Sequence, residues 1–350
     1  MLMYKHLSRI LVIAVFLIPG QNLAQVGGST TYSQLDLAGS ARQSGLGGSL
    51  ISIRDQDISL CLQNPTLLDS TADSKTILNY VNYIGDINYG FAGYAKHYKN
   101  IGTFMAALQY NNYGKFTETD AIGNTLGKFN AADYSLNVGC GRQFDSSFSY
   151  GGNLKLLYSQ FERYNSLGAA VDLAASYYRK RAGFSATIMF KNIGYQFKPY
   201  VKGNRQKLPF QLQAAFSKRL KHAPLRLHVS LDHLLKWDLS YIDPTLKPQT
   251  DPATGEEIPV KEPGFTNKLM RHITPGAELL IGKNFYADLS YNYRRRQENK
   301  YSEKPGLVGF AWGFGIRIKK FSLAFSRARY HLAGASNQVT IAVKLSEFGN

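Results

Sequence analysis

The chain has 350 residues, of which 44% are hydrophobic and 13% aromatic, and its formal net charge is +17. A chain this apolar is not expected to be disordered, and its length is enough for one large domain or two ordinary ones. Its 23 tyrosines, 20 phenylalanines and 32 glycines are typical of a β-rich protein.

Residues 1–24 are predicted to form a secretory signal peptide. Lys5 and Arg9 provide the basic start, residues 10–18 the apolar core and residues 22–24 a cleavage site. The apolar core is too short for a helix that spans a bilayer, and no later stretch approaches 18 consecutive apolar residues. The sequence therefore excludes a helical membrane protein.

Residues 25–76 show no sustained alternation of apolar and polar side chains and are rich in glycine and small polar residues. Their apolar residues include Leu46, Leu50, Ile51, Ile53, Leu60 and Leu62. A free tail in the periplasm would not need these side chains. We therefore expect this segment to be an N-terminal plug that packs inside the domain formed by residues 77–350.

From residue 77 onward, large apolar side chains alternate with small or polar ones. In residues 309–318, for example, Phe310, Trp312 and Phe314 alternate with glycine and alanine. Period two indicates β-strands with two different faces. Fourteen strands are predicted, near 77–83, 87–96, 101–113, 132–142, 148–160, 166–178, 182–192, 209–219, 225–237, 271–282, 285–297, 307–318, 321–331 and 337–348.

The lengths of the connections predict a transmembrane outer-membrane β-barrel. Connections after even-numbered strands are short, whereas those after most odd strands are long, notably 114–131, 193–208 and 238–270; the short 84–86 connection is an exception. Short turns at one end and long loops at the other are typical of such barrels. The even strand number then places both termini in the periplasm and the long loops outside the cell.

A soluble β-sandwich is the alternative, since its strands would also alternate. Its inner face would carry the bulky side chains and its outer face the charged ones. Here the face opposite the bulky side chains is small or polar, which suits a lumen filled by something else. Barrel closure also removes the strand edges that lipid cannot satisfy.

Charged residues are predicted to face the lumen. The predicted set is Asp172, Asp232, Asp288, Arg226, Arg294 and Arg317. Arg42, Asp55 and Asp57 of the plug are candidate partners that would position it, and a path for a ligand is the alternative use of these charges.

No catalytic, cofactor-binding or metal site is expected. His228, Ser230 and Asp232 share one strand face, but alternate residues lie roughly 6.5–7 Å apart, too far for hydrogen bonds along one strand. His228 and His233 fall on opposite faces and cannot chelate one ion. Cys61 and Cys140 belong to no metal-binding motif, and whether they form a disulfide is left open.

Two features of the predicted external end are candidates for binding partners. The loop 238–270 contains Pro244, Pro248, Pro252, Pro259 and Pro263, which would lower the entropy cost of holding an extended docking surface; a solvated cap is the alternative. Arg294, Arg295 and Arg296 are expected at the external end of a strand, where they could contact lipopolysaccharide phosphates. Nucleic acid is not an expected partner.

Several segments resemble known barrel families. The segments "SARQSGLGG" (40–48) and "RDQDISLCLQNPTLL" (54–68) resemble the N-terminal hatch of FadL-type outer-membrane barrels, with Asn64 and Pro65 matching its motif and Thr66 replacing the usual alanine. The segments 86–98, 110–120, 190–200, 208–227 and 233–241 together resemble the PorQ family of the type IX secretion system of the Bacteroidetes.

The PorQ resemblance implies an anchoring role. Such a barrel would belong to an attachment complex with PorU and PorV and hold a PorZ-like surface protein, so that cargo is processed and joined to anionic lipopolysaccharide. The alternatives are a FadL-like transporter of small hydrophobic molecules, which would need an apolar pocket near the plug and a lateral gap in the wall, and an outer-membrane lipid hydrolase.

Overall fold

The computed structural model describes residues 30–240, 249–250, 257–258, 262–299, 306–331 and 334–347. The predicted signal peptide lies outside the described residues, as do Pro244, Pro248, Pro252 and Pro259. No helix within the described ranges is long and apolar enough to cross a membrane.

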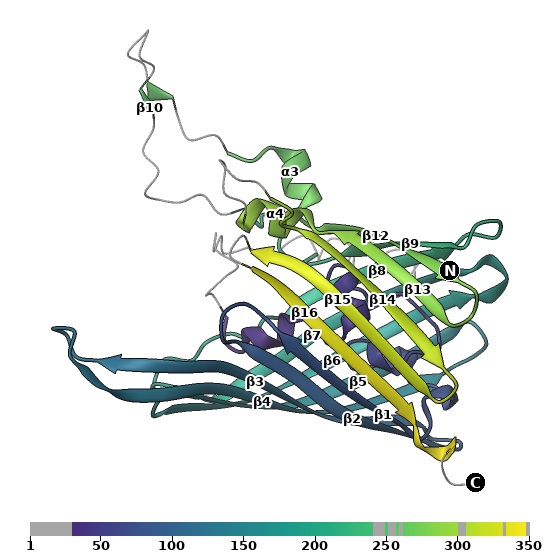
Figure 1. The fold of residues 1–350 in the computed structure, drawn as a ribbon, viewed down its shortest axis with the longest axis horizontal. Coiled ribbons are helices and arrows are strands. Elements are labelled where there is room, and N and C mark those ends of the chain that lie inside the picture. Colours follow the sequence, from purple (N-terminus) through teal and green to yellow (C-terminus); the bar gives the residue numbers. More distant parts are fainter. Residues whose placement is uncertain are drawn as a thin grey trace, which may run out of the picture.

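Fourteen antiparallel strands form a closed barrel (Figure 1). In chain order they are β1 (Lys75–Asn82), β2 (Asn88–Tyr98), β3 (Gly102–Thr119), β4 (Thr125–Gln143), β5 (Phe148–Phe161), β6 (Tyr164–Arg179), β7 (Phe184–Lys198), β8 (Gln211–Arg219), β9 (Leu225–Leu231), β12 (Ile273–Ile281), β13 (Phe285–Tyr291), β14 (Phe310–Ile318), β15 (Phe321–His331) and β16 (Gly334–Lys344). Each strand pairs with its neighbour in sequence, and β1 pairs with β16 to close the sheet. The fold is therefore the predicted outer-membrane type of barrel.

The side-chain pattern of the strands agrees with a barrel that has lipid outside and protein inside. On β14, Phe310, Trp312 and Phe314 are 40–44% exposed, whereas Ala311 is 3% exposed. On β6, Ser166, Gly168, Ala170 and Asp172 face inward and are buried. The bulky face is thus the outer one, which excludes the β-sandwich.

The connections divide the molecule into two ends. The turn end carries 99–101, 144–147, 180–183, 220–224, 282–284 and 319–320, and the loop end carries the others. The small two-stranded sheet of β10 (Gln249–Thr250) and β11 (Glu257–Ile258), α3 (Phe265–Met270) and α4 (Tyr293–Asn299) lie at the loop end (Figure 1). The 3-10 helices η5 (Lys180–Ala182) and η6 (Leu345–Glu347) lie at the turn end.

Several predicted boundaries were wrong. The region 114–131 is mostly strand, because β3 and β4 continue as a long hairpin beyond their neighbours (Figure 1). β7 likewise extends to Lys198, into the predicted loop 193–208. β9 and β13 end early, at Leu231 and Tyr291, and α4 replaces the predicted end of the strand 285–297.

Residues 30–74, here called the inner segment, lie inside the barrel (Figure 1). The segment contains η1 (Ser33–Asp36), α2 (Ala41–Gly45), η2 (Ile58–Leu60), η3 (Pro65–Leu67) and η4 (Ser70–Ala72). Leu46, Leu50, Ile53 and Ile58 belong to a buried apolar cluster that also includes Phe91 and Met105 of the wall. Small inward side chains leave the room that this segment fills.

The inner segment runs from one end of the barrel to the other. The Thr31 amide donates to the carbonyl of Lys207 at the loop end, and the Leu345 amide donates to the carbonyl of Ser74 at the turn end. The last described residues therefore lie at the turn end. The position of the N-terminus itself stays a prediction, because residues 1–29 are outside the described part of the chain.

Candidate functional site

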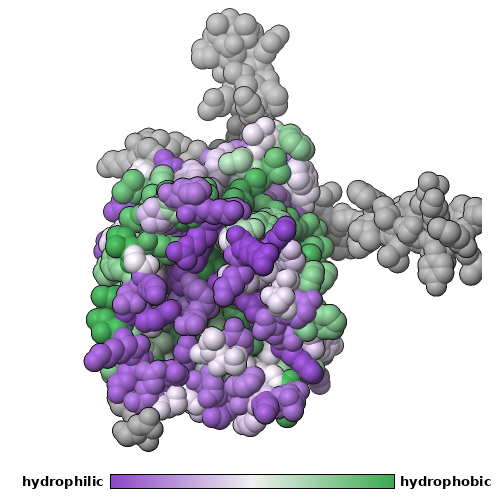
Figure 2. Space-filling model, turned by 90° about the vertical axis from the view of Figure 1, so that its right-hand side faces the viewer, coloured by the Kyte–Doolittle hydropathy of each residue, from purple (hydrophilic) through white to green (hydrophobic). Residues whose placement is uncertain are grey.

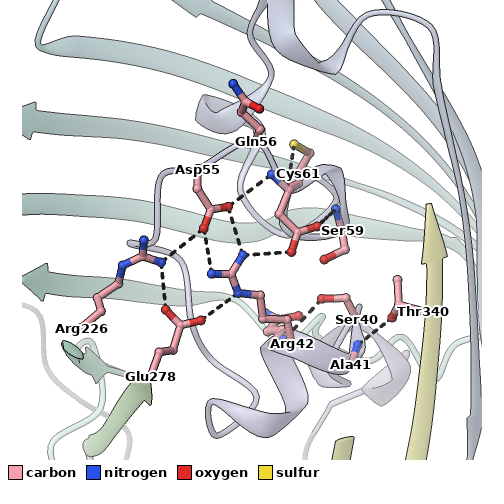
Figure 3. Close-up of polar contacts among 12 residues, drawn as sticks. Ser40, Ala41, Arg42, Asp55, Gln56, Ser59, Cys61, Arg226, Glu278 and Thr340 are labelled. Atoms are coloured by element: carbon pink, nitrogen blue, oxygen red, sulfur yellow. Dashed lines mark hydrogen bonds and ion pairs between the residues drawn. The ribbon is translucent and has the colours of Figure 1, made fainter. Parts of the chain in front are cut away.

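A network of buried ion pairs joins the inner segment to the barrel wall (Figure 3). The Arg42 side chain on α2 donates from Nε to Glu278 of β12 at 2.8 Å, from Nη2 to Asp55 at 2.7 Å and from Nη1 to Asp57 at 3.0 Å. Arg226 of β9 contacts Glu278 at 2.8 Å and Asp55 at 3.2 Å. Ion pairs among two arginines and three carboxylates thus attach the inner segment to β9 and β12.

Local structure aims Arg42 at this network. Ser40 caps α2 by accepting from the Gln43 amide, and the Ala41 amide donates to Thr340 Oγ1 of β16 at 2.8 Å. The guanidinium group also lies over the Tyr286 ring, 4.4 Å from its centre. The planar fork of arginine can satisfy several carboxylates at once, which a lysine cannot do.

Charge neutralisation is what makes this buried network tolerable. Arg42 is 2% exposed and Glu278 is fully buried. Burial raises the pKa of the Asp55 carboxyl, but Arg42 and Arg226 outweigh it, so that this pKa lies below its ordinary value. The ion pairs therefore contribute stability above the ordinary pKa of about 3.9 and lose it as the pH falls through the lower folded-state value.

Asn64, Pro65 and Thr66 form a second attachment of the inner segment. Asn64 Nδ2 donates to the Ile51 carbonyl at 2.6 Å, and its Oδ1 accepts from the Thr66 amide at 3.0 Å. The Thr66 hydroxyl reaches Ser176 of β6 at 2.5 Å. The threonine that replaces the usual alanine of the motif thus adds a hydrogen bond to the wall.

Glycines of the wall make room for this motif. A Cβ placed on Gly141 of β4 would lie 2.2 Å from the Pro65 carbonyl oxygen, and one on Gly151 of β5 would lie 2.7 Å from its carbonyl carbon. Only a residue without a side chain permits such close approach of two backbones.

A cavity of about 840 Å³ lies between the ion-pair network and the turn end. Arg42, Asp55 and Arg226 form part of its lining, together with basic residues from the turns and strand ends. Viewed from this side, the molecule shows a hydrophilic face with a central hollow (Figure 2).

Backbone pairing between β7 and β8 stops part-way along β7, where side-chain hydrogen bonds of Asn192 to the Pro209 carbonyl and of Gln196 to the Gln206 amide replace it. Two residues of β7, Lys191 and Asn192, lie opposite Asp172 of β6, and Asn192 has a positive φ of 60°. This bulge is stabilised by Asp172, which accepts from the Asn192 amide at 2.8 Å and pairs with Lys155 at 2.7 Å. Bulges bend a strand and end its pairing.

Beyond the bulge, the β7–β8 ladder ends at Lys191 and Gln211. Pro209 lies two residues before the start of β8 and has no amide hydrogen to continue the ladder. A pocket of about 430 Å³ lies here, lined by residues 192–196, 205–208 and 210. Its Leu208 packs against Tyr32 and Leu35 of the inner segment. A largely apolar pocket thus lies between the inner segment and the place where the β7–β8 backbone ladder ends, here called the β7–β8 gap.

The structure brings together most of the predicted lumen charges. Asp172, Asp232, Asp288 and Arg226 are buried in the barrel, and Arg317 lines the cavity. Within the described chain, no hydrogen bond joins His228, Ser230 and Asp232, and no group of three His, Cys, Asp or Glu residues could hold a metal ion. Cys61 and Cys140 are free thiols.

The three predicted lipopolysaccharide residues lie on α4 and not at a strand end. Arg294 donates to the His233 ring, Arg295 stacks over Tyr330 with 3.7 Å to the ring centre, and Arg296 donates to the Gly306 carbonyl at 2.7 Å. Their side chains therefore have protein partners at the loop end. Pro263 is the described proline of the predicted docking loop, directly before α3.

Sequence reasoning missed two buried charged residues of the wall, of which Glu278 positions the inner segment and Lys155 stabilises the β7 bulge. Glu278 was detectable, because it occupies an inward position of a predicted strand whose other inward residues are uncharged. Lys155 also lies at an inward position of a predicted strand, but its pairing with Asp172 and the bulge at Asn192 depends on the register of three strands.

No protein-family model and no curated protein matches the chain. Its structure is similar to the Pseudomonas putida toluene transporter TodX, with a TM-score of 0.49 and 12% identity over 88% of this chain and 98% of that chain. It is also similar to the CymD monoaromatic hydrocarbon channel (TM-score 0.49, 10% identity, 88% and 97% covered) and to a Pseudomonas aeruginosa FadL homologue (TM-score 0.44, 10% identity, 87% and 98% covered). At these values the similarities carry no argument about function, and the assignment of a barrel is based on the strand pairing of this chain.

Proposed function

We propose that the protein is an outer-membrane transporter of small hydrophobic molecules, with its short turns in the periplasm and its long connections outside. The observation that carries this proposal is the pocket at the β7–β8 gap, which touches the inner segment through Leu208. A hydrophobic molecule could pass sideways between the lumen and the lipid there while the inner segment closes the direct route. The proposal involves no enzymatic step and no cofactor.

Filling the pocket tests this function. We expect Leu208→Trp to lower uptake of a small hydrophobic dye such as 1-N-phenylnaphthylamine by at least about tenfold, because a misfit of one to a few methylene groups costs about 1–3 kcal/mol in a close-fitting apolar site. Uptake would be measured in cells that carry equal amounts of folded barrel, assessed by the shift of its gel mobility on heating.

The matched control is Phe144→Trp, which enlarges a 77% exposed side chain in a turn away from the gap. Equal uptake by the parent, the control and Leu208→Trp would show that the pocket is not on the route. A folded Leu208→Trp variant is required, and Leu208→Met, which nearly conserves the volume, should keep the uptake of the parent.

We further propose, as a second role suggested by the sequence, anchoring of a PorZ-like surface protein beside PorU and PorV. The observation that favours it is an exposed apolar cluster at the loop end: Trp237 and Phe265 pack with ring centres 5.3 Å apart and are 48% and 69% exposed. Exposed aromatic clusters of this kind are typical of protein interfaces. Contact of Arg294–Arg296 with lipopolysaccharide belongs to the same proposal.

A pull-down from gently solubilised outer membranes tests the anchoring role. We expect the tagged protein to bring down a large surface protein and other barrels in a defined ratio, and Trp237→Ala with Phe265→Ala to reduce that yield at least about tenfold, since such anchors each contribute about 2 kcal/mol or more. Phe144→Ala at the turn end is the control. A barrel that comes down alone would contradict this role.

A further inference from the structure

The cavity at the turn end is surrounded by positive charge from several elements. Apart from Arg42 and Arg226 of the ion-pair network, its basic lining residues are Arg54, Lys180, Arg219, Lys283 and Arg317. They come from the inner segment, η5, β8, the β12–β13 turn and β14. Basic side chains from five separate parts of the chain therefore line one cavity.

Most of this charge has no carboxylate partner within the described residues. The acidic lining residues, Asp55 and Asp57, are engaged by Arg42. Arg54 donates to Ser149 at 3.1 Å, and within the described residues Lys180, Arg219, Lys283 and Arg317 have no carboxylate partner. The cavity thus holds an excess of cations beyond the two arginines of the network, and of these Arg317 also acts on Asp55 through its charge.

The strand register adds repulsion between like charges to this excess of positive charge. Arg219 of β8 lies directly opposite Arg226 of β9, and like charges at opposed positions are destabilising. Glu278 neutralises Arg226 but not Arg219. Arg317 is shared with a neighbouring cavity of about 450 Å³, in which Lys75 and Lys319 stand beside Asp57, Asp73 and Glu347. A cleft with an excess of one sign of charge concentrates counter-ions.

We propose that this cavity is a binding site for a small molecule that carries two or more carboxylate or phosphate groups. Its volume falls in the range of about 300–1,000 Å³ typical of small-molecule sites. Arg219 and Arg317 would bind the anionic groups with their planar forks, and Lys180 and Lys283 would stand at the mouth. The site opens at the turn end, opposite to the β7–β8 gap, and is independent of the transport proposed above.

Calorimetric titration of the purified full-length protein with pyrophosphate and with citrate tests the site. In 150 mM salt we expect at least one of the two to bind with a Kd below about 1 mM. Arg219→Gln and Arg317→Gln should each weaken binding at least tenfold, whereas Arg219→Lys, which keeps the charge, should lose less. Preference for pyrophosphate would identify phosphate as the group recognised, and preference for citrate would identify carboxylate.

Arg179→Gln is the matched control, because Arg179 ends β6 at the same end of the barrel but is exposed and does not line the cavity. Its binding should equal that of the parent. Equal weakening by Arg179→Gln and Arg219→Gln would reveal diffuse attraction to a basic surface and overturn the proposal. Absence of binding to both probes by the folded parent protein would overturn it as well.

Discussion

Replacement of Arg42 by methionine is expected to release the inner segment and make Cys61 reactive toward a polar maleimide. The change leaves Glu278 fully buried and Asp55 and Asp57 partly buried; Arg226 remains as the partner of Glu278 and Asp55, whereas Asp57 loses its ion pair. Loss of one partner from a buried ion pair typically costs about 3–5 kcal/mol. Because every 1.4 kcal/mol is a tenfold change in an equilibrium, the open population should rise by about a hundredfold to a few thousandfold.

Cys61 is a suitable reporter of this opening. It is 2% exposed, and burial raises the pKa of its thiol, so that it should be inert while the inner segment is in place. Labelling would be followed in a Cys140→Ser background to leave one thiol. When opening and closing are fast, the labelling rate follows the open population.

Two variants define the interpretation of that experiment. Arg54→Met removes an arginine of the same segment that donates one hydrogen bond to Ser149, and it should label nearly as slowly as the parent. Arg42→Lys keeps the charge but loses the fork, and it should fall between the parent and Arg42→Met. Arg42→Met labelling within a factor of two of the parent would show that the network does not hold the segment.

Valine at Gly141 or Gly151 is expected to dislodge η3 from the wall. The added side chain would overlap the Pro65 backbone, and a backbone cannot move aside as a flexible side chain can. Overpacking of a well-packed core typically costs about 1–3 kcal/mol, and backbone overlap should place these variants at or above that upper value. Denaturant unfolding followed by tryptophan fluorescence, together with Cys61 labelling, would measure the effect.

Gly127→Val provides the control on the same strand as Gly141. Gly127 lies in the part of β4 that extends beyond the neighbouring strands, and a Cβ there would have Glu118 Oε2 as its nearest neighbour, at 3.6 Å. Its unfolding should change by no more than about 0.5 kcal/mol, as for most surface substitutions. If Gly141→Val unfolds like Gly127→Val, the close approach of Pro65 to the wall is not a constraint on the fold.

The strands were predictable because two different environments act on their two faces. Phe310, Trp312 and Phe314 face outward and Ala311 faces inward, so large and small side chains alternate along the sequence with a period of two. The pattern fades in the β3–β4 hairpin, where Phe116 and Phe129 stack on one face but are followed there by Glu118 and Gly127. That region was therefore mistaken for a loop.

The candidate sites were only partly predictable. Arg42, Asp55 and Asp57 are conspicuous as charges in a buried segment, and the structure brings them together. The β7–β8 gap was not foreseen, because it depends on a left-handed backbone at Asn192 and on which residues lie opposite Pro209. The helical conformation of Arg294–Arg296 was missed because a short polar run fits either a strand end or a helix.

The inner segment is synthesised before the barrel strands, but its contacts with the wall can be completed only after the last strand. Arg42 and Glu278 are 236 positions apart, and Ala41 and Thr340 are 299 apart. A nascent chain therefore carries the segment through synthesis without its wall partners, and contacts of such long range form slowly. The bond from Ala41 can form only once β16 has arrived, which is also the strand that closes the barrel on β1. Seating of the segment would thus coincide with closure of the barrel.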